Sequence, residues 1–226
     1  MAFPERAESM IDFERARAQM VESQLRGGGV TNAPILAQMR AISREDFVAP
    51  GRRDVAYVDD IQWLGHGSRR FLAAPATLAK LLKLAEISPA DSVLDIGAAT
   101  GYSTAVIAGL AASVVALEQD GDLAALAATN LARLGLTNAS VVAGSIDQIG
   151  ARRFDAILAQ GSLDIVPDAF LAALSEGGRL VALIRAGAVS VAHVFVKASG
   201  RVTARAEFNA FLPPLLVGQA NEAFVF

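Results

Sequence analysis

The sequence predicts a doubly wound, mostly parallel α/β sheet with added helices at its N-terminus and an antiparallel hairpin at its C-terminal edge. The first observation is an apolar strand at residues 92–96 that runs into a turn of small residues, 97–101. The second is another apolar strand about twenty residues later, at 113–117, which is followed by the carboxylate of Glu118. The third is the alternation of strand-like and helix-like segments after residue 75, which is typical of parallel sheets.

Composition and charge narrow the class of protein. The chain has 226 residues, of which 53% are hydrophobic and 19% are charged, so it is long enough for one domain with a sizeable core. Every apolar run is interrupted before about eighteen residues, so we expect no membrane span. The mixed charges of residues 1–17 do not match a signal peptide, and the net charge of −3 without a long basic run gives nucleic-acid binding little support. We expect a cytoplasmic enzyme.

The residue types also bear on metal and redox chemistry. There are no cysteines, which excludes disulfides, thiolate metal sites and a cysteine nucleophile. The chain has two histidines and no carboxylates clustered at metal-ligand spacing, so we expect no metal ion.

Residues 1–75 are predicted to form a helical extension and a loop, and residues 76–226 the sheet domain, the two together making one compact unit. Apolar spacing predicts a helix from residue 11 to the glycines at 27–29. Thr31 or Asn32 can cap a second helix, which carries Pro34 in its first turn. Residues 56–75 show little periodicity and are expected to form a long loop.

The elements after residue 75 follow from their periodicity. Helices are predicted at 78–84, 102–110, 123–134 and near 168–174, and strands at 92–96, 113–117, 140–143, 154–159 and 179–184. From residue 189 onward the apolar residues alternate without an obvious crossover helix, ending at 224–226. This pattern predicts the antiparallel edge hairpin.

The turn after the first strand indicates the type of cofactor. It reads Asp95-x-Gly97-x-Ala99-x-Gly101, which matches neither the G-x-G-x-x-G turn that binds a pyrophosphate nor a phosphate-binding P-loop. An acid two residues before the first glycine, with glycines four apart, matches the turn used for S-adenosylmethionine. Asp95 would meet the ammonium of that ligand's tail, and Glu118 would accept hydrogen bonds from the two ribose hydroxyls.

Further motifs carry a resemblance to a known family. The segments 154–158 and 174–180 resemble the ordered motifs of class I methyltransferases, which have a Rossmann-like sheet. The N-terminal half resembles the protein-L-isoaspartate O-methyltransferase family in these segments, which occur in the same order: Met20-Val21-x-x-Gln24-Leu25-Arg26-x-x-Gly29-Val30, Ile35-Leu36-x-x-Met39, Arg44-Glu45-x-Phe47-Val48, Ala56-Tyr57-x-Asp59 and Gly65-His66-Gly67. The resemblance runs from about residue 20 to residue 184.

That resemblance implies methyl transfer from S-adenosylmethionine to the α-carboxylate of isoaspartyl residues, which starts the repair of damaged proteins. A protein or peptide would then be the substrate. The cofactor contacts that it implies are Asp95, Gly97, Ala98, Ala99, Gly101, Glu118 and Gln119, completed by Ser145 and Ile146 after the third strand and Gln160 after the fourth.

The acceptor side departs from the family pattern. The family carries a Gln-Thr-Ile-Ser-x-Pro segment whose hydroxyls lie at the acceptor site. Counting back from Pro75, its threonine and serine fall on Phe71 and Ala73; counting forward from Gly67, only Ser68 offers a hydroxyl. In addition, Ser145 stands where the family has an adenine-side carboxylate. The sequence assigns no catalytic residue, and its acceptor-side candidates are Ser68, Arg69, Arg70 and Ala73.

Two questions stay open on the sequence. Arg69 and Arg70 are expected to be solvated loop charges, the alternative being a guanidinium that clamps an acidic acceptor. For the function there are three readings: an isoaspartyl methyltransferase, a methyltransferase of the same build with another acceptor, and a non-catalytic descendant that binds the cofactor or a protein partner.

Overall fold

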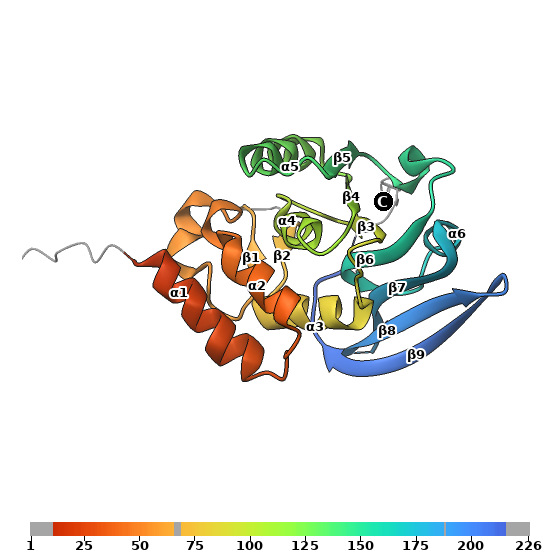
Figure 1. The fold of residues 1–226 in the computed structure, drawn as a ribbon, viewed down its shortest axis with the longest axis horizontal. Helices are drawn as coiled ribbons and strands as arrows, with labels where there is room; N and C mark the ends of the chain where they lie inside the picture. Colours follow the sequence, from red (N-terminus) through yellow and green to blue (C-terminus); the bar gives the residue numbers. More distant parts are fainter. Residues whose placement is uncertain (1–10, 66–68, 188, 216–226) are drawn as a thin grey trace, which may run out of the picture.

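The protein is built on a seven-stranded, mostly parallel sheet (Figure 1). A computed structural model describes residues 11–65, 69–187 and 189–215. The strands are β3 (Ser92–Ile96), β4 (Ser113–Glu118), β5 (Ala139–Ala143), β6 (Phe154–Leu163), β7 (Leu174–Ala186), β8 (Val189–Ala198) and β9 (Arg201–Ala210). They lie in the order β5-β4-β3-β6-β7-β8-β9. The strands from β5 to β7 pair in parallel, and β8 and β9 pair antiparallel, so the predicted fold class is confirmed.

The chain order of the strands creates a reversal point at β3. From β3 the chain proceeds through β4 to β5 on one side, and later through β6 to β7 on the other. Side chains on both faces of β3 are buried, Val93 and Leu94 completely, which explains why the segment reads as a continuous apolar run. In open α/β sheets, ligands bind beyond the carboxyl ends of the strands at such a reversal.

The helices that connect or flank these strands are α3 (Pro75–Ala85), α4 (Tyr102–Ala108), α5 (Gly121–Arg133) and α6 (Asp168–Ala172). Figure 1 shows α3, α4 and α5 on one side of the sheet and α6 on the other. The strand and helix over residues 92–108 match the predicted ones closely. Strands β6 and β7 extend beyond the predicted segments 154–159 and 179–184.

The N-terminal extension is helical, as predicted. Helix α1 (Phe13–Gln19) continues into a π-helical segment (Met20–Arg26), and α2 (Ala33–Ala41) follows. Asn32 is the residue that caps α2, because its side chain accepts a 3.1 Å hydrogen bond from the Ile35 amide. Helix α2 contacts α3 and α4 (Figure 1), and one buried hydrophobic cluster contains residues from this extension and from the sheet.

The segment predicted as a long loop, 56–75, contains a small hairpin. Strands β1 (Gln62–Trp63) and β2 (Phe71–Leu72) pair antiparallel, with Trp63 opposite Phe71. Their rings make an edge-to-face contact at 5.6 Å between centroids. The expectation of a loop without strands is therefore wrong for these residues, because two-residue strands are too short to produce an alternation that a sequence can reveal.

At the C-terminal edge, the antiparallel hairpin of β8 and β9 confirms the prediction, whereas the strand-like residues 224–226 lie outside the described part. After β9 the chain returns to β6: the Ser162 amide donates to the Pro213 carbonyl at 2.9 Å, and the Leu215 amide donates to the Ser162 carbonyl at 2.8 Å. Across the described ranges, no helix is long and apolar enough to cross a membrane.

Candidate active site

The turn after β3 has a backbone that its small residues permit. Gly97 and Gly101 have φ angles of +80° and +91°, and Ala99 has a φ of +53°. The amides of Gly97 and Ala98 both point at the Leu117 carbonyl, at 2.8 and 3.3 Å, which ties the turn to β4. A Cβ atom on Gly101 would lie 3.3 Å from the Ala127 Cβ of α5. Glycine at these positions therefore allows both the backbone conformation and the close packing.

Asp95, at the end of β3, is fully buried and held by three side chains. Ser103 and Thr104 of α4 each donate a 2.6 Å hydrogen bond to Oδ2, and Gln160 of β6 donates a 2.7 Å hydrogen bond to Oδ1. Burial raises the pKa of Asp95 despite these donors. In this structure Asp95 joins β3, α4 and β6, and its contact with a ligand's ammonium stays a prediction.

Glu118, at the tip of β4, is also fully buried. Its Oε2 accepts a 2.8 Å hydrogen bond from the Ala99 amide, and its Oε1 accepts one of 3.0 Å from the Asp120 amide. Oε1 also forms a 2.7 Å ion pair with Nη2 of Arg70. The structure thus brings the glycine turn and the acid of the next strand together, as the sequence predicted.

Arg70 corrects one of our expectations. Its side chain is only 11% exposed and is ion-paired, so it is not a solvated loop charge. Its neighbour Arg69 is exposed, as expected. Ser68 lies outside the described residues. The sequence could not indicate the partner of Arg70, because Glu118 belongs to a strand far along the chain.

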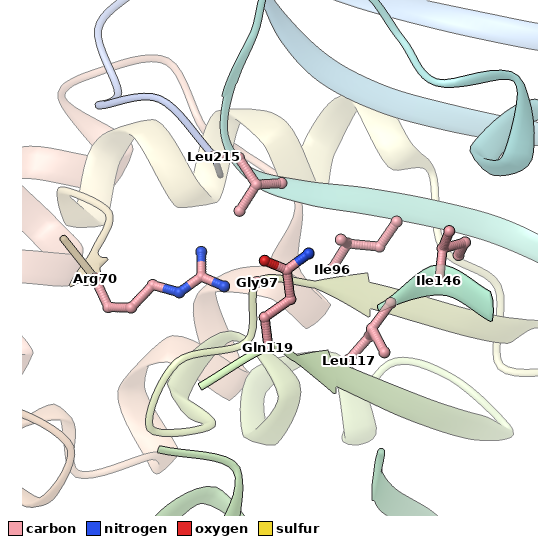
Figure 2. Close-up of a pocket in the computed structure, with 7 residues that line it drawn as sticks. All are labelled: Arg70, Ile96, Gly97, Leu117, Gln119, Ile146 and Leu215. Atoms are coloured by element: carbon pink, nitrogen blue, oxygen red, sulfur yellow. The ribbon is translucent and has the colours of Figure 1, made fainter. Parts of the chain in front are cut away.

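A pocket lies at the carboxyl ends of β3 and β4 (Figure 2). Its lining includes four residues that the sequence assigned to the site and three apolar ones: Arg70, Gly97, Gln119 and Ile146, with Ile96, Leu117 and Leu215. Ser145 comes just before Ile146, and its Oγ donates to the Asp147 carboxylate at 3.2 Å. The walls of this pocket are thus mostly apolar, with charge supplied by Arg70 on the side of the N-terminal hairpin.

A second pocket lies between the acceptor-side segment and the glycine turn. It is lined by Phe71, Leu72 and Ala73 of the acceptor-side segment, by Gly97 and Ala98 of the turn, and by Leu78, Tyr102, Ser103 and Gln160. The structure therefore places Ala73 and Gln160 beside the same turn. No group of three or more metal-ligating side chains gathers anywhere in the described residues.

Three contributors to this region were not predicted from the sequence: Arg44, Tyr102 and Leu215. Arg44 is fully buried; its Nη2 donates a 2.8 Å hydrogen bond to the Ala73 carbonyl and its Nε one of 2.8 Å to the Ala56 carbonyl. Its guanidinium also lies 4.8 Å from the ring centroid of Tyr102. Arg44 belongs to one of the family motifs, which was the only available signal for its importance.

Comparison with known proteins agrees with this geometry. The family model for protein-L-isoaspartate(D-aspartate) O-methyltransferase matches residues 15–218. Among curated relatives, the protein-L-isoaspartate O-methyltransferase of Koribacter versatilis is 35% identical over 195 residues, which are 85% of this chain and 87% of that protein. The one from Methanoculleus marisnigri is 37% identical over 190 residues, 83% of this chain and 86% of that protein.

Solved structures agree in fold. A putative protein-L-isoaspartate O-methyltransferase from Plasmodium falciparum, in complex with S-adenosyl-L-homocysteine, superposes with a TM-score of 0.77 at 22% identity, covering 89% of this chain and 99% of that one. The predicted family, its methyltransferase class and its S-adenosylmethionine cofactor are confirmed at the level of the family. The chain belongs to the protein-L-isoaspartate(D-aspartate) O-methyltransferase family.

Proposed function

We propose that this chain transfers the methyl group of S-adenosylmethionine to the carboxylate of isoaspartyl residues in damaged proteins or peptides, and that it does so in the cytoplasm. The observation that carries the proposal is the glycine turn after β3 facing Glu118 at the tip of β4, at the reversal point of the sheet. Membership of the family supplies the substrate class.

The residues around the first pocket suit the cofactor chemically. Ile96, Leu117 and Ile146 offer apolar surfaces on which an adenine ring can pack, and the Glu118 carboxylate suits the two ribose hydroxyls. Gly97 keeps the turn free of a side chain at this position, where a Cβ would lie 2.5 Å from Leu215 Cδ1. When bound, the cofactor supplies a methyl group activated by its sulfonium.

The remaining chemical demand is the placement of the acceptor. An isoaspartyl carboxylate is ionised at neutral pH, so it attacks without a general base, and orientation contributes most of the acceleration. Phe71, Leu72 and Ala73 lie next to Gly97 in the second pocket, and the Ala73 carbonyl is held by Arg44. We infer that the backbone and shape of this segment position the acceptor, because Phe71 and Ala73 lack the family's hydroxyls.

The test is methyl transfer from labelled S-adenosylmethionine to an isoaspartyl peptide, with the same peptide carrying normal aspartate as the matched control substrate. We expect base-labile label only in the isoaspartyl peptide. Glu118→Ala should abolish this transfer together with cofactor binding measured by calorimetry. If the wild-type chain binds the cofactor but labels the two peptides equally or not at all, the proposal is wrong.

A further inference from the structure

The ion pair between Arg70 and Glu118 joins two parts of the molecule that meet at the proposed cofactor site. Arg70 directly precedes β2 in the hairpin that β1 and β2 form, whereas Glu118 is the last residue of β4 in the sheet. Figure 2 shows the guanidinium extending from the hairpin side toward Gly97 and Gln119. Nη2 lies 2.7 Å from Oε1, and the two side chains are 11% and 0% exposed, so water screens this pair little.

Counting the acceptor positions of Glu118 shows what this ion pair prevents. A carboxylate offers about four lone-pair positions, two on each oxygen. Oε1 already accepts from Arg70 and from the Asp120 amide, while Oε2 accepts from the Ala99 amide. A ribose that donates one hydroxyl to each oxygen therefore finds a position on Oε2 and none on Oε1. The Arg70 guanidinium has to leave Oε1 before both ribose hydroxyls can bind.

Electrostatics explain why the guanidinium is there. A fully buried carboxylate without a counter-charge is strongly unfavourable, and Arg70 compensates Glu118 in the absence of a ligand. Cofactor binding then exchanges an ion pair, in which both groups are charged, for hydrogen bonds from neutral hydroxyls, which leave the carboxylate without its counter-charge. The ion pair must therefore lower the affinity for the cofactor.

We propose that Arg70 is a latch on the cofactor site, closing it in the cofactor-free protein by occupying Glu118 Oε1 and being displaced by the ribose. This inference rests on the proposed function only for the class of cofactor. It makes Arg70 a residue that sets cofactor affinity. It also gives a role to one of the two arginines beside the segment in which the family carries its acceptor hydroxyls.

Calorimetric titration of the full chain with S-adenosylhomocysteine tests the latch. Arg70→Met keeps the aliphatic stem and removes the guanidinium, and we expect it to lower Kd about tenfold, equivalent to about 1.4 kcal/mol. Arg70→Lys keeps the charge but loses the planar geometry, so its Kd should fall by a smaller factor. Arg69→Met removes the same charge from the exposed neighbouring residue and should leave the Kd within about twofold of wild type.

The other outcomes overturn the latch. A higher Kd in Arg70→Met would show that the guanidinium binds the cofactor, and an unchanged Kd would show that it does not compete with it. Thermal unfolding of each variant establishes that it is folded. If Arg70→Met does not fold, the Arg70→Lys titration decides, since a latch requires tighter binding and a cofactor ligand requires weaker binding.

A second measurement needs no cofactor. A double-mutant cycle of Arg70→Met and Glu118→Gln, measured by urea denaturation, tests whether the two residues are coupled. We expect the change in unfolding equilibrium constant of the double variant to differ about tenfold from the product of the changes in the two single variants. Additive effects would overturn the ion pair. Neither measurement involves an acceptor, so the latch can fail while isoaspartyl methylation stands, and the reverse.

Discussion

Gln160 Nε2 donates a 2.7 Å hydrogen bond to Asp95 Oδ1 and thereby joins β6 to the end of β3 beside the glycine turn. Ser103 and Thr104 fill the other oxygen from α4, so three elements converge on one buried carboxylate. Because the turn runs between Asp95 and Ser103, this cluster fixes both of its ends. The position of the candidate cofactor pocket therefore depends on the Asp95 carboxylate, whose protonation depends on its burial and on these three donors.

Asp95→Asn should stabilise the fold at neutral pH. Burial raises the pKa of Asp95 in the folded protein, so its contribution to stability is fully present below the unfolded-state pKa and is lost as the pH rises through the folded-state pKa. The uncharged Asn does not suffer this loss. The difference in free energy of unfolding, variant minus wild type, should therefore increase from about pH 4 upward, by up to about 1.4 kcal/mol per pH unit.

Urea denaturation between pH 4 and pH 8 measures this difference. Asp164→Asn is the control for the same substitution at the surface: the Asp164 side chain is 70% exposed and pairs with Arg185, and we expect its removal to change the free energy of unfolding by less than about 1 kcal/mol. A stability difference that moves in favour of wild-type Asp95 as the pH rises would contradict the prediction. The amide suits the site, because its oxygen can accept from Ser103 and Thr104 while its nitrogen faces a reoriented Gln160.

Gly97→Ala should destabilise the protein through two separable effects. The φ of +80° costs a side chain about 1–2 kcal/mol, and the added Cβ would lie 2.5 Å from Leu215 Cδ1. Gly177 is the matched control, since its φ is +79° and nothing lies within 4 Å of its Cβ position. Gly177→Ala should thus show the backbone cost alone, measured as the free energy of unfolding in urea.

The contact with Leu215 is tested by the double variant Gly97→Ala/Leu215→Ala. It should recover the part of the loss that exceeds that of Gly177→Ala, once the effect of Leu215→Ala alone is subtracted. Equal losses for the two glycine variants, with no recovery, would mean that Leu215 does not cover the turn in solution.

The sequence predicted the centre of the fold because its signals there are local. The buried run 92–96, the glycine turn and the acid after the next strand each stand in a short segment whose pattern depends on neighbours in the chain. These local features are sufficient to predict that Glu118 lies next to the turn. The motif resemblance then indicated the family.

What the sequence missed depends on contacts between distant segments. Arg70 is buried only because Glu118 lies opposite it, and Arg44 only because the carbonyls of Ala56 and Ala73 accept its hydrogen bonds. Arginine is mostly exposed in proteins, and neither the residues next to Arg70 nor the motif that contains Arg44 indicates that these side chains are buried while that of Arg69 is exposed. The partners of Arg70 and Arg44 are brought to them only by the tertiary fold.

Arg44→Met should cost about 3 kcal/mol or more, because it leaves two buried carbonyls without their donor and removes the stacking on Tyr102. Arg26→Met is the control, since Arg26 is 53% exposed and pairs with Glu22 at the surface; we expect a loss below about 0.5 kcal/mol. Chemical denaturation measures both values. A loss as small as that of Arg26→Met would show that the Ala73 segment does not depend on Arg44.

Arg179 offers the opposite case from Arg70, because it lies at the amino ends of the strands rather than at the carboxyl ends. Its guanidinium donates to the carbonyls of Ala85, Glu86 and Asp155 and pairs with Asp91, so it ties β7 to the end of α3 and to the starts of β3 and β6. These acceptors lie away from both pockets at the glycine turn.

Arg179→Met should therefore lower the free energy of unfolding by about 2 kcal/mol through lost charge-assisted hydrogen bonds, while the Kd for S-adenosylhomocysteine stays at the wild-type value. Arg70→Met should change that Kd. Calorimetry and urea denaturation of the two variants together show whether cofactor affinity depends on the carboxyl ends of the strands and stability on their amino ends. If Arg179→Met weakens cofactor binding as much as it weakens the fold, the two edges are coupled, and the change in cofactor affinity of Arg70→Met no longer identifies a local latch.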